Sequence, residues 1–150
     1  MADTHKPVPD YSGRFGRAVD KFFQNIQPAK WFLRMNWFVH VDPSLFQPRW
    51  KSKIMGANIT PETAGDCLWL RSERQTFHRL ARTGAVVLTF HSYLEKLKNI
   101  ICTQELASQF SGLLRNMPYE TQKYRHMEIV LPALLIWLER ACEDPSGLTR

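Results

Sequence analysis

The sequence has few cysteines, and their spacing matches neither a zinc site nor a disulfide framework. The 150 residues include three cysteines, Cys67, Cys102 and Cys142, an odd number of residues that lie far apart. No CxxC pair and no Cys/His pair at zinc-finger spacing is present. We therefore expect free thiols, as in a reducing compartment, and not a disulfide-rich secreted protein.

Short motifs that identify common enzyme classes are also missing. The sequence contains no GxSxG, no P-loop, no GxGxxG and no HExxH, and its carboxylates form no pair at a telling spacing. These absences argue against an α/β-hydrolase, a P-loop NTPase, a Rossmann dehydrogenase and a zinc metalloprotease. The histidines and one Arg/Glu cluster remain as carriers of any chemistry.

Long hydrophobic segments are absent as well. The longest apolar run, Ile129–Leu138, is ten residues long and contains Pro132, whereas a membrane-spanning helix needs about 20 residues. The N-terminal sequence MADTHKPVPDY has no basic segment followed by an apolar one, so it does not resemble a secretory signal. We expect a soluble, cytoplasmic protein without a membrane partner.

Basic residues outnumber acidic ones. Twenty Lys and Arg face fourteen Asp and Glu, for a net charge of +6. This excess favours an anionic partner such as a phosphate, a carboxylate or an acidic protein surface. No run of five Lys or Arg occurs, so nucleic acid is not an expected partner. The apolar fraction of 44% suits a globular chain, and the length suits a single domain over residues 1–150.

Hydrophobic periodicity predicts the elements of the first half. Apolar residues recur at helical spacing over residues 15–26, and Ser12 is a candidate N-cap. A strand is expected over 31–41, where the apolar residues alternate with others. Residues 48–66, which begin with Pro48, are expected to form a long irregular loop, either a functional lid or a variable insertion.

The second half is predicted to contain a hairpin and two helices. Residues 68–94 have the pattern of two strands joined by a turn. Helical spacing returns over 106–117 behind Thr103 as N-cap, and again over 121–143, where Pro132 should kink the helix or delay its start. The fold expected from this order is α+β, an antiparallel sheet with flanking helices.

The first strand carries the strongest candidate ligand. One of its faces is wholly apolar, and the other holds polar groups among aromatic ones, so we expect it to be buried on both sides as the wall of a ligand pocket. The apolar face comprises Trp31, Leu33, Met35, Trp37, Val39 and Val41, and the mixed face comprises Phe32, Arg34, Asn36, Phe38 and His40. His40 could ligate haem iron, with Arg34 pairing a propionate, or it could be a half-buried histidine that hydrogen-bonds a nearby loop. His91 is the alternative ligand.

The first arm of the hairpin, LWLRSERQTFHRL, carries an unusual density of charge. Glu73 lies between Arg71 and Arg74, and a nearby arginine holds a carboxylate ionised and oriented, whereas burial acts in the opposite direction. If the cluster faces a cavity, Glu73 could pair with a cationic amine. The same residues could instead be the protective charges of an edge strand or a modest surface ion pair. Arg74, Arg79 and Arg82 could equally form a patch that docks an acidic partner.

Several segments resemble one protein family. NWFVHVDPSLFQP (36–48), LWLRSERQTFHRL (68–80) and RTGAVVLTFHSYL (82–94), together with HKPVPDY (5–11) and AVDKFF (18–23), resemble the haem-dependent oxidative N-demethylase alpha-subunit-like family. The resemblance covers about residues 5–140. One departure is His91, which stands where family members usually have an arginine.

The resemblance implies a fold and a chemistry beyond what the pattern gives. It implies a haem b domain distantly similar to the PAS fold, acting in the oxidation of a small secondary amine with O2 and with electrons from NADPH through flavin and iron–sulfur partner subunits. The resemblance itself does not assign the iron ligand. From the residues, His40 is the leading candidate, and Arg34, Arg74, Arg79 and His91 are the other candidates for binding the cofactor. Arg71, Glu73 and Gln75 would line the chamber as catalytic residues.

The resemblance also concerns length. Family proteins are about twice as long as this chain, which corresponds to their C-terminal half, so we expect an incomplete PAS-like sheet. The chain would then be either a truncated, inactive form or a shortened paralogue that has lost the chemistry. The alternative expectation is a non-catalytic PAS-like scaffold that docks an acidic ligand or protein through its basic hairpin.

Overall fold

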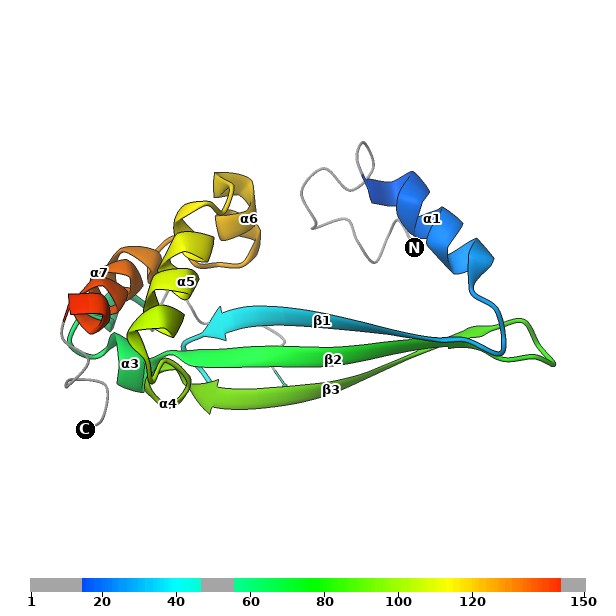
Figure 1. The fold of residues 1–150 in the computed structure, drawn as a ribbon, viewed down its shortest axis with the longest axis horizontal. Coiled ribbons are helices and arrows are strands. Elements are labelled where there is room, and N and C mark those ends of the chain that lie inside the picture. Colours follow the sequence, from blue (N-terminus) through cyan, green and yellow to red (C-terminus); the bar gives the residue numbers. More distant parts are fainter. Residues whose placement is uncertain (1–14, 47–55, 144–150) are drawn as a thin grey trace. The chain divides into compact units, whose positions relative to one another are not determined.

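The computed structural model describes residues 15–46 and 56–143 (Figure 1). Three strands form one antiparallel sheet in the order β1-β2-β3, accompanied by helices, so the predicted α+β class is confirmed. Its distant likeness to the PAS fold stays a prediction. The elements are α1 (Gly16–Asn25), β1 (Trp31–His40), η3 (Gly56–Asn58), α3 (Ala64–Cys67), β2 (Trp69–Arg79), β3 (Val86–Lys96), α4 (Leu97–Ile100), α5 (Gln104–Arg115), α6 (Tyr119–Tyr124) and α7 (Leu131–Glu143).

The chain divides into two compact units. The first, which we call the hairpin unit, comprises Met1–Trp37 and Ser72–Ser92. The second, the helical unit, comprises Phe38–Arg71 and Tyr93–Arg150. Each strand of the sheet therefore contributes residues to both units. The expectation that residues 1–150 form a single domain stays a prediction.

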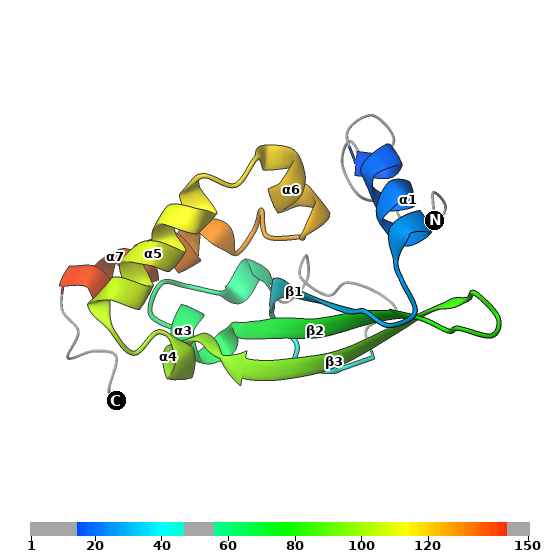
Figure 2. The same cartoon turned by 45° about the vertical axis from the view of Figure 1, so that its right-hand side comes forward.

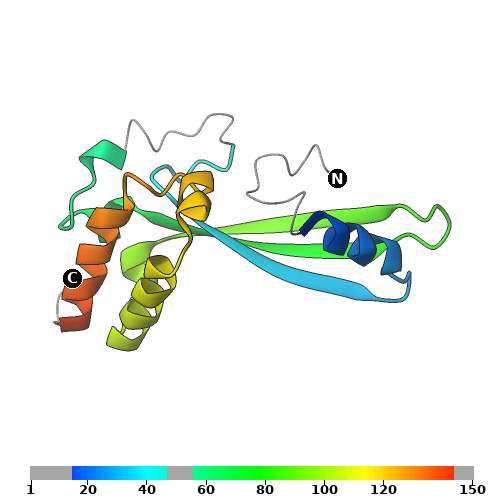
Figure 3. The ribbon, with the colours of Figure 1, turned by 90° about the horizontal axis from the view of Figure 1, so that it is seen from above.

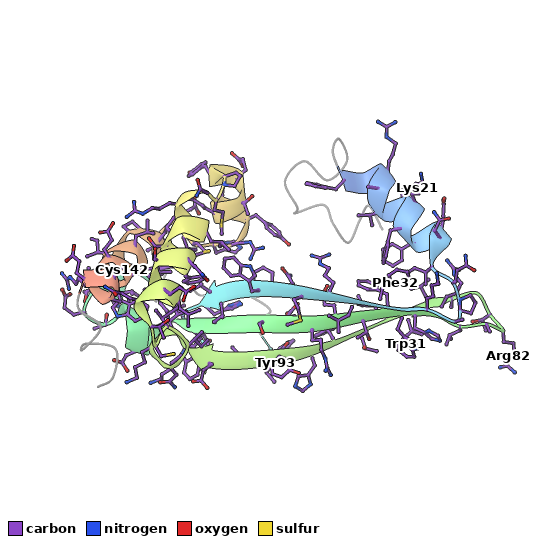
Figure 4. All side chains as sticks on the ribbon, in the orientation of Figure 1. Lys21, Trp31, Phe32, Arg82, Tyr93 and Cys142 are labelled. Carbon is purple, nitrogen blue, oxygen red and sulfur yellow. The ribbon has the colours of Figure 1, made fainter. Side chains whose placement is uncertain are left out.

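Aromatic rings build the core of the hairpin unit. Phe77 of β2 is buried, and its ring meets those of Phe22 and Phe23 edge-on at 5.7 and 5.6 Å between centroids. Phe32 of β1 points toward α1 (Figure 4) and meets Phe22 at 5.2 Å. Edge-to-face contacts at these distances are favourable beyond the area they bury. The predicted helix around residues 15–26 is confirmed as α1, whose aromatic face packs on the sheet; its candidate N-cap Ser12 lies outside the described residues.

Arg79, at the end of β2, fastens α1 to the hairpin. Its Nε donates a hydrogen bond of 2.8 Å to the Ile26 carbonyl, and its two Nη atoms donate to the carbonyls of Phe23 and Gly84. Carbonyl groups at a helix C-terminus have no partner within the helix and carry partial negative charge, so a cation there is doubly favourable.

The expectation that β1 is buried on both sides is wrong for its first half. Trp31, Leu33 and Met35 are 68%, 63% and 55% exposed. They lie on the face opposite Phe32, as Figure 4 shows for Trp31. Alternation correctly assigned these residues to one face, but an apolar face is buried only where another element packs on it, and α1 packs on the other one.

The hairpin has the register that its turn imposes. The Leu80 amide donates to the Ala85 carbonyl at 2.8 Å, and Gly84 adopts a φ of 71°, which a glycine tolerates without strain. Further from the turn, the Thr76 and Thr89 hydroxyls hydrogen-bond across the two strands, which fits the same register. The two predicted hairpin arms are thus confirmed as β2 and β3.

The helical unit is centred on α5 and α7, which lie side by side in Figures 2 and 3. Their contact buries small and aliphatic residues, Ala107, Leu114, Leu134, Leu138 and Ala141. Thr103 caps α5 as predicted, since its hydroxyl accepts the Leu106 amide. Pro132 is the second residue of α7, so it delays the start of the last helix and does not kink it.

The irregular loop expected at 48–66 is wrong for its second part. The described residues include η3 and the first residues of α3, whereas 48–55 lie outside the described residues. Two threonines organise this segment: the Thr63 hydroxyl accepts the Thr60 amide at 3.0 Å. Such local hydrogen bonds start a helical turn without any apolar periodicity, which explains why the pattern did not reveal it.

An ion pair links this segment to α7. Arg140 donates a hydrogen bond of 2.7 Å to Glu62, and both side chains are exposed. That hydrogen bond, with smaller help from the backbone of Glu62 and the Thr60 hydroxyl, lowers the pKa of Glu62 from 4.5 to about 2. A carboxyl group whose pKa is lowered by folding stabilises the fold at any pH above its ordinary pKa. This contribution is lost as the pH falls from 4.5 toward 2. Exposure keeps the contribution small.

Arg140→Gln should therefore raise the pKa of Glu62 toward its ordinary value. Carboxyl-carbon NMR titration of the two proteins measures the shift directly. Arg115→Gln serves as the matched control, because it removes the other ion pair of α7, with Glu139, and leaves the partner of Glu62 in place. An unchanged Glu62 titration in Arg140→Gln would contradict the role assigned to this arginine.

Candidate functional site

The predicted iron ligand lies at the end of β1, in the helical unit. His40 is the last residue of the strand and only 6% exposed. Its imidazole lies beside the Phe38 ring, with 5.9 Å between ring centroids and a tilt of 55°. The strand places both rings on one face because their positions differ by two. Val39 and His40, at the end of β1, are buried as expected, whereas the three residues before them are half-buried.

Arg125 contacts the same aromatic ring. Its guanidinium carbon lies 5.0 Å from the Phe38 centroid, within the range of a cation–π interaction. Arg125 ends α6, where its amide donates to the Thr121 carbonyl at 2.9 Å, and His126 follows with a φ of 54°. An imidazole and a guanidinium thus share one phenyl ring. Sequence analysis missed Arg125, because no local pattern connects the end of α6 with a strand 85 positions earlier.

A buried carboxylate fixes the chain as it leaves β1. Asp42 is 7% exposed, and its Oδ1 accepts hydrogen bonds from the Ser44 amide at 2.9 Å and the Ser44 hydroxyl at 2.7 Å. These hydrogen bonds form an Asx turn two residues after His40. Arg71 supports the same segment, since its Nη1 donates to the Leu45 carbonyl at 3.2 Å. Asp42 was not among the predicted site residues, although Asp-Pro after a strand is a turn signal.

The remaining predicted residues belong to the hairpin unit. Gln75 donates a hydrogen bond of 3.2 Å to the carboxylate of Glu73, and both side chains are half-buried on the α1 side of the sheet. By strand alternation, Arg34 lies on the same face of β1 as Phe32, and its side chain is exposed. Arg79 uses its guanidinium on backbone carbonyls, as described above.

Arg74 and His91 lie on the opposite face. The hydroxyl pair of Thr76 and Thr89 sets the register, so Arg74 and His91 are the next cross-strand pair on that side. Both are exposed. The predicted site residues therefore fall into three groups: His40 and Arg71 in the helical unit, and two sets on opposite faces of the hairpin unit. Their roles stay predictions.

A comparison with protein families identifies the relatives of this chain. Residues 1–135 match the model of the family described as haem-dependent oxidative N-demethylase, alpha subunit-like. The chain belongs to this family. The resemblance found in the sequence is thereby confirmed, and the family's name implies that haem is part of its chemistry.

The side chains around His40 include groups of the kinds that could hold a haem, as the family's name leads one to expect. In residues 15–46 and 56–143, no group of three or more His, Cys, Asp or Glu side chains could hold a metal ion. A haem needs no such group, because the porphyrin supplies four ligands and the protein one imidazole. His40 offers that imidazole, Phe38 an apolar ring, and Arg125 a cation of the kind that pairs with a propionate.

Among the described residues of this N-demethylase family member, no helix is both long enough and apolar enough to cross a bilayer. The family match extends over most of both units, because residues 1–135 include all of the hairpin unit and α5 and α6 of the helical unit.

Proposed function

We propose that this chain is a haem-binding member of the oxidative N-demethylase family and that His40 is its iron ligand. The observation that carries the proposal is the shared ring: the His40 imidazole and the Arg125 guanidinium both contact Phe38. Imidazole, aromatic ring and guanidinium are all groups of kinds that proteins use to bind haem: a ligand for the iron, an apolar contact and a partner for a carboxylate.

Each residue has a separate task in this proposal. His40 holds the iron through a neutral imidazole, and the Asx turn at Asp42 keeps the strand end that presents it in place. Arg125 orients the cofactor through a propionate. The bound haem supplies the oxygen chemistry, and the protein supplies the ligand, the orientation and the electrostatics.

The reaction that we propose is the oxidative N-demethylation of a small secondary amine, with O2 as oxidant and electrons from NADPH through flavin and iron–sulfur partner subunits in the cytoplasm. Support comes from the family's name, which specifies an alpha subunit and hence an assembly. Glu73, held by Gln75, would bind the cationic amine, and Arg71 is the third residue that we propose as catalytic. This chain by itself would bind haem without turning over amine.

Haem titration followed by absorption spectroscopy tests the proposal. We expect the purified chain to give a Soret band with haem b, and His40→Gly to lose most of it. Added imidazole should then restore the band, because a free ligand can enter the space left by the missing side chain. Far-UV circular dichroism shows whether the variant is folded.

His91→Ala is the matched control for this titration. His91 was the alternative ligand, is exposed and lies in the other unit, so its replacement should leave the Soret band unchanged. A band that survives in His40→Gly and disappears in His91→Ala would assign the iron to His91. Absence of any bound haem in the unmodified chain would overturn the proposed function.

A further inference from the structure

A residue with a left-handed backbone follows Arg125 directly. His126 has a φ of 54°, and within residues 15–46 and 56–143 it is the one residue other than glycine with a positive φ. Such a conformation is uncommon outside glycine, and strained backbone of this kind tends to cluster at functional sites. The proposed function uses Arg125 and gives its neighbour no task, so the conformation of His126 needs an explanation of its own.

Two backbone hydrogen bonds define how α6 ends. The Met127 amide donates to the Gln122 carbonyl and the His126 amide donates to the Lys123 carbonyl, each at 3.0 Å. This pair of bonds is the Schellman motif, in which the left-handed position is usually a glycine. A Cβ at that position crowds the backbone, so histidine is the less stable choice there. The backbone bonds therefore hold His126 in a conformation that its own side chain disfavours.

The chain is anchored directly after this residue. Met127 is completely buried, and its carbonyl accepts hydrogen bonds from the amides of Val130 at 3.1 Å and Leu131 at 2.8 Å. Leu131 is the first residue of α7, so the buried methionine also begins the last helix. His126 is thus the joint between α6 and a segment that is fixed in the core of the helical unit.

The conformation of this joint decides where the Arg125 guanidinium lies. Its carbon is 5.0 Å from the centroid of the Phe38 ring. Cation–π contacts extend to about 6 Å, which leaves a margin of roughly 1 Å. Because Met127 is held in the core, a change of φ at His126 displaces the end of α6, which carries Arg125. The contact with Phe38 therefore depends on the left-handed backbone.

We infer that His126 is a positioning residue, whose left-handed backbone holds Arg125 over Phe38 in the place where the guanidinium meets a haem propionate. The inference rests on the proposed function for the identity of the group that Arg125 binds. It gives the His126 imidazole no part in binding the iron. Glycine adopts a positive φ freely and a β-branched residue does so only with strain, so these two replacements should have different effects.

Haem affinity, measured by titration of the Soret band, tests the inference. Arg125→Ala should weaken haem binding about tenfold, the effect of one hydrogen bond to a charged group. His126→Val should weaken it by a similar factor, whereas His126→Gly should bind haem within about twofold of the parent. The double variant Arg125→Ala/His126→Val should bind no more weakly than Arg125→Ala, because one residue acts through the other.

Gly65→Ala is the matched control for a loss of stability. It should destabilise the helical unit, since a Cβ at Gly65 would lie too close to the Trp137 indole, and it changes no residue of the turn after α6. Haem affinity should stay within about twofold of the parent, as for an independent site. If His126→Val does not fold, His126→Ala replaces it, because alanine is less strained at a positive φ than a β-branched residue.

Two results of the titration would overturn the inference. Multiplied weakening in the double variant would show that His126 does not act through Arg125. Equal weakening by His126→Gly and His126→Val would show that the imidazole, and not the backbone conformation, is what binding requires.

NMR spectroscopy of the chain without haem separates this inference from the proposed function. The ring current of Phe38 shifts the side-chain protons of Arg125, and Phe38→Leu identifies that shift by removing it. We expect the shift to persist in His126→Gly and to be lost in His126→Val. Persistence in His126→Val would overturn the inference whether or not haem binds. If the unmodified chain binds no haem but His126→Val loses the shift, the proposed function fails and the positioning of Arg125 stands.

Discussion

Phe77→Ala is expected to lower the free energy of unfolding by about 3–5 kcal/mol, the usual cost of removing a buried phenyl ring. Phe77 is 7% exposed and touches two rings of α1, so its loss leaves a cavity and breaks the contacts that hold α1 on the sheet. Urea unfolding followed by circular dichroism measures the change, and a smaller helical signal in the folded variant would show that α1 has lost its order.

Phe90→Ala provides the comparison, because it deletes the same ring from the same sheet at a site that is 63% exposed. We expect a change below about 1 kcal/mol there. Equal destabilisation by the two variants would show that Phe77 is not the centre of this core and would contradict the arrangement of rings described above.

Two glycine-to-alanine changes in the helical unit should have opposite signs. A Cβ at Gly65 would lie 2.6 to 2.9 Å from atoms of the Trp137 indole, closer than packed atoms approach. Gly65→Ala must displace the indole or the short helix α3, and overpacking of this kind costs about 1–3 kcal/mol. Thermal unfolding should show a clear decrease in Tm.

Gly112→Ala makes the same chemical change where the space is open. No atom lies within 4 Å of the position that its Cβ would take among the described residues, and Gly112 is inside α5. Alanine there should stabilise the chain by roughly 0.5–1 kcal/mol, because glycine is the poorer helix former. A stabilising Gly65→Ala would disprove the close approach of α3 to Trp137.

The spacing of apolar residues correctly predicted the helices and strands that have a regular apolar pattern. Apolar spacing located α1, β1, both hairpin arms and α5, and Thr103 capped α5 as its position suggested. These elements follow from local rules, since a helix or a strand repeats its own contacts with a short period. The start of α7 next to Pro132 could also be predicted, because proline is tolerated in the first turn of a helix and not in its interior.

Burial could not be predicted in the same way. The apolar face of β1 suggested a buried strand, yet Trp31 and Leu33 are exposed while His40 on the mixed face is buried. Which face is covered depends on where α1 and α6 pack, and these elements are distant in sequence from the strand positions that they cover. The contact of Arg125 with Phe38 is of this kind: it depends on the tertiary fold and leaves no local signal.

The hydrogen bonds of Arg79 have a consequence for the order of events during synthesis. Their acceptors on α1, the carbonyls of Phe23 and Ile26, precede the guanidinium by 56 and 53 residues. A ribosome that adds roughly 5–20 residues each second produces α1 several seconds before the side chain that fastens it. During that interval the aromatic face of α1 also lacks Phe77, so α1 cannot reach its final place until the hairpin has been made.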